Sequence, residues 1–213
     1  MAQRRGPKYE PVYADAENVE IYEVFAKLGC GGYSTVWLCF DTQNQKWRAV
    51  KVMAAVVSTE DCADLKIMEA LKGLNLEGTH IMLPMGYFWI DGLNGRHLCL
   101  VLPVLGPSVR EVLQESLTVR KDIMWQVAQG LQFLHDHNIC HGDLRTDNIM
   151  LRMPCLDHIT KDEMETLLEE PEKDDVHTLD ERGEDPVAPK YLVSAQRIKM
   201  KPELNAAIID FGV

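Results

Sequence analysis

The chain has 213 residues and a formal net charge of −11 at pH 7, a length that suffices for one ordinary domain or two small lobes. Its composition, 46% hydrophobic and 26% charged, is that of a soluble globular protein. The acidic balance disfavours nucleic acid as a general partner, permits a basic peptide substrate, and is most simply a solvated surface.

No apolar run approaches the roughly 20 residues that a membrane span needs. The start of the chain, MAQRRGPKYE, lacks the apolar core of a signal peptide. We therefore expect an intracellular protein, cytoplasmic or nuclear, that neither crosses nor binds a membrane.

The cysteines form no CxxC pair, and no histidine spacing completes a zinc site. Most of them have apolar neighbours in the sequence, so we expect buried, unpaired thiols in a reducing compartment. They are Cys30, Cys39, Cys62, Cys99, Cys140 and Cys155.

Residues 1–20 are polar and contain two prolines, which predicts a loosely ordered lead-in. Residues 24–53 predict three strands, VFAKL, TVWLCF and KWRAVKVM, joined by glycines and by the turn DTQNQ. Ser58 and Asp61 have the spacing of a capping box, and the apolar periodicity after them predicts a helix that stops at Gly73. IMLPMGYFWI and HLCLVLPVL then predict two more strands, which completes a small antiparallel lobe.

The character of the chain changes after Gly106. Apolar residues at helical spacing predict a long helix over residues 118–137. Residues 157–186 are charged and mostly acidic, with two prolines, and we expect a flexible insert there with a single helical turn. PKYLVSAQRI then resumes strand character, and NAAIIDFGV ends the chain.

The first motif with chemical meaning is LGCGGYSTV, residues 28–36. Glycines allow backbone N–H groups to approach phosphate oxygens closely, although an ordinary glycine-rich hairpin explains the pattern equally well. The GK[ST] ending of a P-loop is absent. On the next strand, Lys51 alternates with apolar residues in AVKV. Most such lysines reach solvent, but this one lies on a strand adjacent to the glycine hairpin, within reach of the same phosphates.

Two more motifs supply carboxylates. In HGDLRTDN, Asp143 and Asn148 offer a carboxylate and an amide oxygen to a reacting hydroxyl and a hard metal ion. In IIDFG, Asp210 ends a predicted buried strand. Each motif, taken singly, also fits an ordinary turn or strand end.

Together, and in this order, the four motifs resemble those of the protein kinases over residues 22–213. KLGCGGYSTVWLCFD, CLVLPVLGPSV and the acidic insert before DFG are similar to the SR-protein kinases, especially the fungal ones. The resemblance implies an α+β, bilobal, protein-kinase-like fold. Residues 21–105 would form a complete N-lobe, a five-stranded antiparallel sheet with one helix, and residues 106–213 only the first part of a helical C-lobe, including the insert 157–186.

The resemblance implies ATP and Mg²⁺ as cofactors. Lys51 would hold the α- and β-phosphates, Asp143 would accept the proton of the substrate hydroxyl, and Asn148 and Asp210 would hold the metal. Arg145 replaces a lysine that touches the transferred phosphate. Arginine keeps the charge but is a planar fork, which leaves the geometry there open.

The resemblance also implies the nucleotide contacts. Leu102 would be the gatekeeper, and the N–H of Leu105 would donate to the base, beyond a proline at the first hinge position. Ser34 stands where the family has its third glycine. The expected ATP contacts are Leu28, Gly29, Cys30, Gly31, Gly32, Tyr33, Ser34, Thr35, Val36, Ala49, Lys51, Leu102, Leu105 and Met150.

Two departures from the family pattern concern charge. The glutamate that pairs with the strand lysine aligns with Asp64, and Glu60 and Glu69 stay open as substitutes. Gly142 replaces the arginine that senses an activation-loop phosphate. We therefore expect activity that phosphorylation of that loop does not switch.

The sequence stops just after DFG, with no activation segment and no further C-lobe helices. We expect either a truncated product or a partner that covers apolar surface on the long helix. The implied function is a serine/threonine protein kinase that transfers the ATP γ-phosphate to a protein hydroxyl, with an Arg/Ser-rich protein as candidate substrate; the activity of this truncated chain is left open. The insert is a candidate site for such substrates, but it is more simply a solvated loop.

Two other functions stay open. One is a truncated, non-catalytic nucleotide-binding or scaffold protein. The other is a small-molecule phosphotransferase, because HGDL…N recurs in that class, although STVW, AVK and DFG favour protein kinases.

Overall fold

The structure is a computed structural model that describes residues 21–92, 94–112, 116–175 and 191–212. The predicted lead-in, residues 1–20, therefore lies outside the described residues, as does the later part of the predicted insert. Within the described ranges, no helix is both long enough and apolar enough to cross a membrane.

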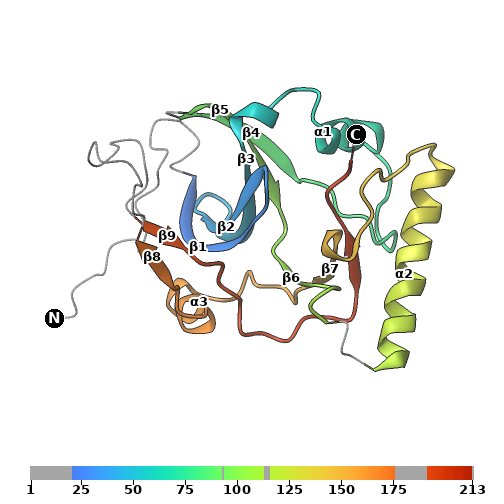
Figure 1. The fold of residues 1–213 in the computed structure, drawn as a ribbon. Coiled ribbons are helices and arrows are strands. Elements are labelled where there is room, and N and C mark those ends of the chain that lie inside the picture. The colour runs from blue at the N-terminus through green and yellow to red at the C-terminus, as the bar shows by residue number, and fades with distance from the viewer. Residues whose placement is uncertain (1–20, 93, 113–115, 176–190, 213) are drawn as a thin grey trace.

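A five-stranded antiparallel sheet forms the first part of the molecule (Figure 1). Its strand order is β1-β2-β3-β5-β4, which confirms the predicted sheet. In the register, Lys51 lies between Val36 on one neighbouring strand and Leu100 on the other. Its position is therefore fixed from both sides. The strands are β1 (Tyr22–Cys30), β2 (Ser34–Asp41), β3 (Lys46–Met53), β4 (Gly86–Gly92) and β5 (Gly95–Leu102).

Helix α1 (Ala63–Ala70) packs on this sheet, where Leu65 joins a buried cluster with Leu98 of β5. The predicted helix start at Ser58 is wrong. Its hydroxyl donates to the carbonyl of Ala54 at 2.9 Å and accepts from the N–H of Leu98 at 2.9 Å. The serine therefore ties the connection before α1, including the 3₁₀ turn Ala55–Val57, to β5 instead of capping a helix.

The second part of the molecule is a three-stranded sheet, in the order β10-β7-β6, with the long helix α2 against it. The helix matches the predicted range to within one residue at each end, and Ser116 caps it by accepting from the N–H of Val119 at 3.4 Å. A Cβ on Gly130 would come within 2.7 Å of a methyl of Ile208, so this glycine allows α2 to approach β10 closely. The elements are β6 (Leu105–Ser108), α2 (Leu117–Asp136), the 3₁₀ turn Thr146–Asn148, β7 (Ile149–Arg152) and β10 (Ala206–Ile208).

The described part of the acidic insert, residues 157–175, is packed, which corrects the prediction of a flexible segment there. It contains helix α3 (Lys161–Leu167) and strand β8 (Lys173–Asp175). Strand β9 (Tyr191–Val193), which pairs with β8, lies after the insert, where strand character was predicted to resume. Helix α3 has a full capping box between Thr160 and Glu163. In Figure 1, α3 and the β8–β9 pair lie beside β1 and β2.

The insert is buried against the five-stranded sheet through a few apolar side chains. Met164 is fully buried, in one cluster with Trp47 of β3 and Val104 of the connection to β6. The indole N–H of Trp47 also donates to the carbonyl of Ile159 at 2.8 Å. Beyond the insert, the carbonyl of Val193 on β9 accepts from the Nζ of Lys27, on β1, at 3.0 Å. The acidic composition of the segment concealed these anchors because they are few among many charged residues.

The six cysteines differ in how far they are exposed to solvent. All six cysteines are unpaired, as predicted, but Cys30, Cys140 and Cys155 are exposed, which corrects the expectation of burial.

On α2, Met124 and Trp125 are 60% and 68% exposed. The long helix therefore does carry uncovered apolar surface, as expected.

Truncation of the insert's central anchor tests its contribution to the fold. We expect Met164→Ala to lower the free energy of unfolding by about 2–5 kcal/mol, because a fully buried methionine leaves a cavity. The matched control, Met124→Ala on the exposed side of α2, should change it by less than about 0.5 kcal/mol. Urea denaturation measures both, and equal losses would contradict a structural role for the insert.

Candidate active site

An ion triad centred on Lys51 joins three elements that are distant in the sequence. The Nζ of Lys51, on β3, lies 2.6 Å from Oδ1 of Asp210, just after β10, and 3.3 Å from Oδ2 of Asp64, on α1. The lysine side chain is 11% exposed and that of Asp64 is 9% exposed, whereas Asp210 is 42% exposed. The triad therefore opens to solvent on the Asp210 side.

The two carboxylates determine the charge state of the lysine. Burial acts to lower the pKa of Lys51, but the attraction of Asp64 and Asp210 outweighs burial, so the pKa is raised above its ordinary value. The ammonium therefore stays charged at neutral pH. Among the three acidic candidates for its helical partner, the structure selects Asp64, while Glu69 pairs with Lys72 instead.

The loop after α2 brings Asp143 and Asn148 together. The amide nitrogen of Asn148 donates to the backbone carbonyl of Asp143 at 2.9 Å and to its Oδ2 at 3.0 Å. These bonds fix the carboxylate of Asp143 through Oδ2. They also leave the amide oxygen of Asn148 available to another group.

His141 connects this loop to the segment that carries Asp210. Its Nδ1 accepts from the N–H of Asp143 at 3.3 Å, so Nε2 must donate to the carbonyl of Ile209, 3.0 Å away. Its ring packs on Phe211 with the centroids 4.9 Å apart. Burial lowers the pKa of His141, which favours the neutral tautomer that these two bonds require.

Gly142 and Gly212 bring the same two segments into backbone contact. Gly142 has φ +80°, and a Cβ on it would lie 3.0 Å from Cα of Gly212; a Cβ on Gly212 would lie 2.7 Å from the carbonyl carbon of Gly142. The N–H of Gly212 donates to the carbonyl of His141 at 2.8 Å. Asp210, at φ 58°, is therefore held between a buried lysine and a tight backbone junction.

The predicted nucleotide contacts lie on both sides of the connection between the two sheets. The glycine hairpin is the β1–β2 turn, where a Cβ on Gly29, Gly31 or Gly32 would meet nothing within 4 Å. Ala49 and Leu102 are paired across β3 and β5. Tyr33 lies in the turn between β1 and β2. The other predicted contacts belong to β1, β2, β6 and β7: Leu28, Cys30, Ser34, Thr35, Val36, Leu105 and Met150. Their contact with a base or phosphate stays a prediction.

A separate cavity of about 740 Å³ lies behind the connection between the sheets, lined by Met68, Ile81 and Pro103 among others. None of the predicted catalytic or metal-binding residues lines it. The chemistry of the site therefore belongs to the ion triad and not to this cavity.

Mg²⁺ fits the donor set, because the carboxylate of Asp210 and the amide oxygen of Asn148 are both hard oxygen ligands. Within the described ranges, no cluster of three or more His, Cys, Asp or Glu side chains could hold a metal ion alone. A metal at these two residues would therefore need further oxygen ligands, which the phosphates of a nucleotide supply.

Arg145 contacts a carboxylate of its own loop. Its guanidinium donates to Asp147 at 2.8 Å and 3.1 Å. Asp147 was not among the predicted site residues. Its sequence signal, an acidic residue two positions after the arginine, is too common to have singled it out.

Substitution of Gly142 tests the backbone junction. We expect Gly142→Ala to destabilise the fold by about 1–3 kcal/mol more than Gly78→Ala, because the new Cβ meets backbone that cannot move aside. Gly78 is the matched control, since its φ is +75° but a Cβ there would meet nothing within 4 Å. Its own loss should be about 1–2 kcal/mol, from the left-handed backbone alone. Urea denaturation compares the two variants, and equal losses would show that the junction is not tight.

Comparison with known proteins shows similarity to protein kinases. The sequence matches the protein kinase domain family over residues 22–159. It is 35% identical over 142 residues to human SRSF protein kinase 3, covering 61% of this chain and 25% of that protein. It is 30% identical over 162 residues to protein kinase dsk1 of Schizosaccharomyces pombe, covering 70% of this chain and 29% of that protein. The chain thus spans less than a third of the length of these relatives.

A solved kinase domain shows the same fold. Its crystal structure aligns with 94% of this chain and 54% of its own length, at a TM-score of 0.57 and 21% sequence identity. At that identity the likeness concerns the fold alone, and it agrees with the five-stranded sheet and the helix α2 described above. Because the family match covers more than half of the chain, and because its relatives include SR-protein kinases, the chain belongs to the eukaryotic protein kinase family and is SR-protein-kinase-like.

Proposed function

We propose that the protein is a serine/threonine protein kinase that transfers the γ-phosphate of ATP to a hydroxyl of a protein substrate. The observation that supports this most directly is the convergence of Lys51 and Asp210 at 2.6 Å, close to the loop of Asp143 and Asn148. One cation and several oxygen donors at a single place are what phosphoryl transfer requires, because its catalysis is mainly positioning and electrostatic stabilisation.

Each residue in the site has a role that its contacts can support. Lys51, kept charged by its two carboxylates, neutralises the α- and β-phosphates and moves from Asp210 toward the nucleotide. Asp143, oriented by Asn148 through Oδ2, accepts the proton of the substrate hydroxyl on Oδ1. Asn148 and Asp210 would hold Mg²⁺, which when bound neutralises charge on the β- and γ-phosphates. The glycine hairpin supplies backbone N–H groups to the phosphates.

We further propose an Arg/Ser-rich protein as the substrate. The name of one relative, SRSF protein kinase 3, refers to SRSF proteins, and this chain has a net charge of −11, which favours basic peptides. Six unpaired cysteines support an intracellular setting.

A non-catalytic nucleotide-binding or scaffold protein is a second candidate. One observation favours it: Leu117, Met124 and Trp125 of α2 are each at least 60% exposed. Such a surface suits a partner that covers this side of the helix. Phosphorylation of an Arg/Ser-rich peptide by the protein, and its loss in Asp143→Asn, would favour the enzyme over the scaffold.

Ligand-induced thermal stabilisation tests nucleotide binding at the ion triad. We expect Mg²⁺ and ATP together to raise the melting temperature of the wild-type chain, since a ligand at 100 times its Kd stabilises the bound fold by about 2.7 kcal/mol. Lys51→Met should abolish the ligand-induced increase, relative to the variant's own melting temperature without ligand.

Lys66→Met is the matched control, because Lys66 is an exposed lysine on α1 that pairs with Asp61. It should retain the full increase in melting temperature. An equal increase in the melting temperature of Lys51→Met would show that the nucleotide does not bind at the ion triad. No increase in the melting temperature of the wild type would contradict the proposed function.

A further inference from the structure

The pair formed by Arg145 and Asp147 lies on the same loop as Asp143, and the reaction proposed above gives Asp147 no part. Arg145 donates from Nε and Nη2 to one oxygen of Asp147, Oδ2, at 3.1 Å and 2.8 Å. The carboxylate is therefore bound to the arginine through a single oxygen.

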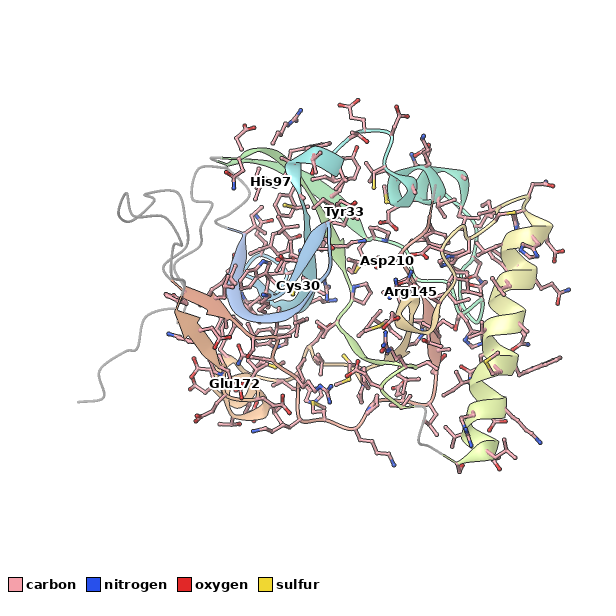
Figure 2. All side chains as sticks on the ribbon, viewed as in Figure 1. Cys30, Tyr33, His97, Arg145, Glu172 and Asp210 are labelled. Atoms are coloured by element: carbon pink, nitrogen blue, oxygen red, sulfur yellow. The ribbon has the colours of Figure 1, made fainter. Side chains whose placement is uncertain are left out.

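The local backbone places this pair beside the reacting groups. The N–H of Asn148 donates to the carbonyl of Arg145 at 2.9 Å and closes the 3₁₀ turn Thr146–Asn148. The side chain of Asn148 in turn holds Asp143. One turn thus determines the positions of the carboxylate proposed to accept the proton, the amide proposed to hold the metal, and the Arg145–Asp147 pair. Figure 2 shows Arg145 near Asp210 in the view, between the five-stranded sheet and α2.

The way Arg145 contacts Asp147 leaves half of its guanidinium available. The fork has five N–H donors, and the two hydrogen bonds use only Nε and one donor of Nη2. Within the described ranges, Nη1 donates no hydrogen bond to another residue. An arginine can therefore bind a carboxylate with one edge and a phosphate with the other, which a lysine ammonium cannot do with fixed orientation.

A second arginine keeps the local charge positive. The Nη1 of Arg110 lies 3.3 Å from both carboxylate oxygens of Asp147, and the N–H of Arg110 donates to the carbonyl of Thr146 at 3.3 Å. Two guanidinium groups thus share one carboxylate. The group retains one positive charge, so Asp147 can orient Arg145 without neutralising its attraction for an anion.

We propose that Asp147 is a positioning residue that holds the guanidinium of Arg145 with its Nη1 edge toward the transferred phosphate of ATP. This inference rests on the proposed function. It also gives a physical reason for the paired presence of Arg145 and Asp147: a planar, flexible side chain needs a fixed partner to direct it, whereas an ammonium donates equally in all directions. The consequence is selective, because ADP lacks the phosphate that Arg145 contacts.

The test measures two dissociation constants by calorimetry on the 213-residue chain, both in the presence of Mg²⁺: one for ADP and one for the non-hydrolysable β,γ-imido analogue of ATP. The ratio of the ADP constant to the analogue constant is the preference for the analogue. We expect Asp147→Asn to lower this preference for the analogue by about fivefold, the upper range for an exposed ion pair, while the affinity for ADP is retained. In an Arg145→Lys background, Asp147→Asn should leave the ratio unchanged, because the residue to be oriented is gone. Asp147→Glu should retain most of the preference.

The controls separate this inference from its alternatives. Asp61→Asn removes another exposed, lysine-paired carboxylate and should not change the ratio. An equal loss for ADP and the analogue would make Asp147 merely structural and overturn the proposal, as would an unchanged ratio. An increased preference for the analogue in Asp147→Asn would also overturn it, by showing that Asp147 holds Arg145 away from the phosphate. If the wild type bound neither nucleotide, the proposed function would fail together with this inference.

Discussion

The buried ammonium of Lys51, held between Asp64 and Asp210, is the interaction on which the rest of the site depends. Removing a charge from water is unfavourable unless partners compensate for it. Here the partners come from α1 and from the end of β10. Because each partner belongs to a different element, the ion triad forms only when α1, β3 and the Asp210 segment are packed together. The energetics of one lysine therefore couple the sheet to the second part of the molecule.

The second part of the molecule supports Asp210 through its backbone. His141 in its neutral form, the contact of Gly142 with Gly212, and the N–H of Gly212 hold the segment against the loop of Asp143. An arginine at position 142 would place a Cβ against Gly212. Glycine at this position therefore permits the close backbone approach of the two segments.

The described part of the acidic insert, residues 157–175, belongs to the folded body of the protein. Its apolar anchors pack against β3 and against Val104, in the connection between the sheets, and its Lys161 forms an ion pair with Glu23 on β1. The strand β1 leads directly to the glycine hairpin. The insert therefore supports the strand that leads into the glycine hairpin, which is proposed to contact the phosphates. The acidic side chains that the structure describes in the insert are exposed, where they contribute most simply to solubility.

The amino-acid sequence by itself determined the elements whose signals are local. Short β-type runs separated by glycines and a turn predicted β1 to β3, and helical periodicity predicted α2. Four motifs in order, through their resemblance to those of protein kinases, predicted Lys51, Asp143, Asn148 and Asp210 as site residues. Only the tertiary structure decided which acid meets Lys51, because Glu60, Asp64 and Glu69 are all carboxylates close together in the sequence and only the fold places that of Asp64 beside the lysine. It also decided that the insert packs and that Ser58 binds β5 instead of capping a helix. These outcomes depend on surfaces that the chain brings together only on folding, and no local pattern records them.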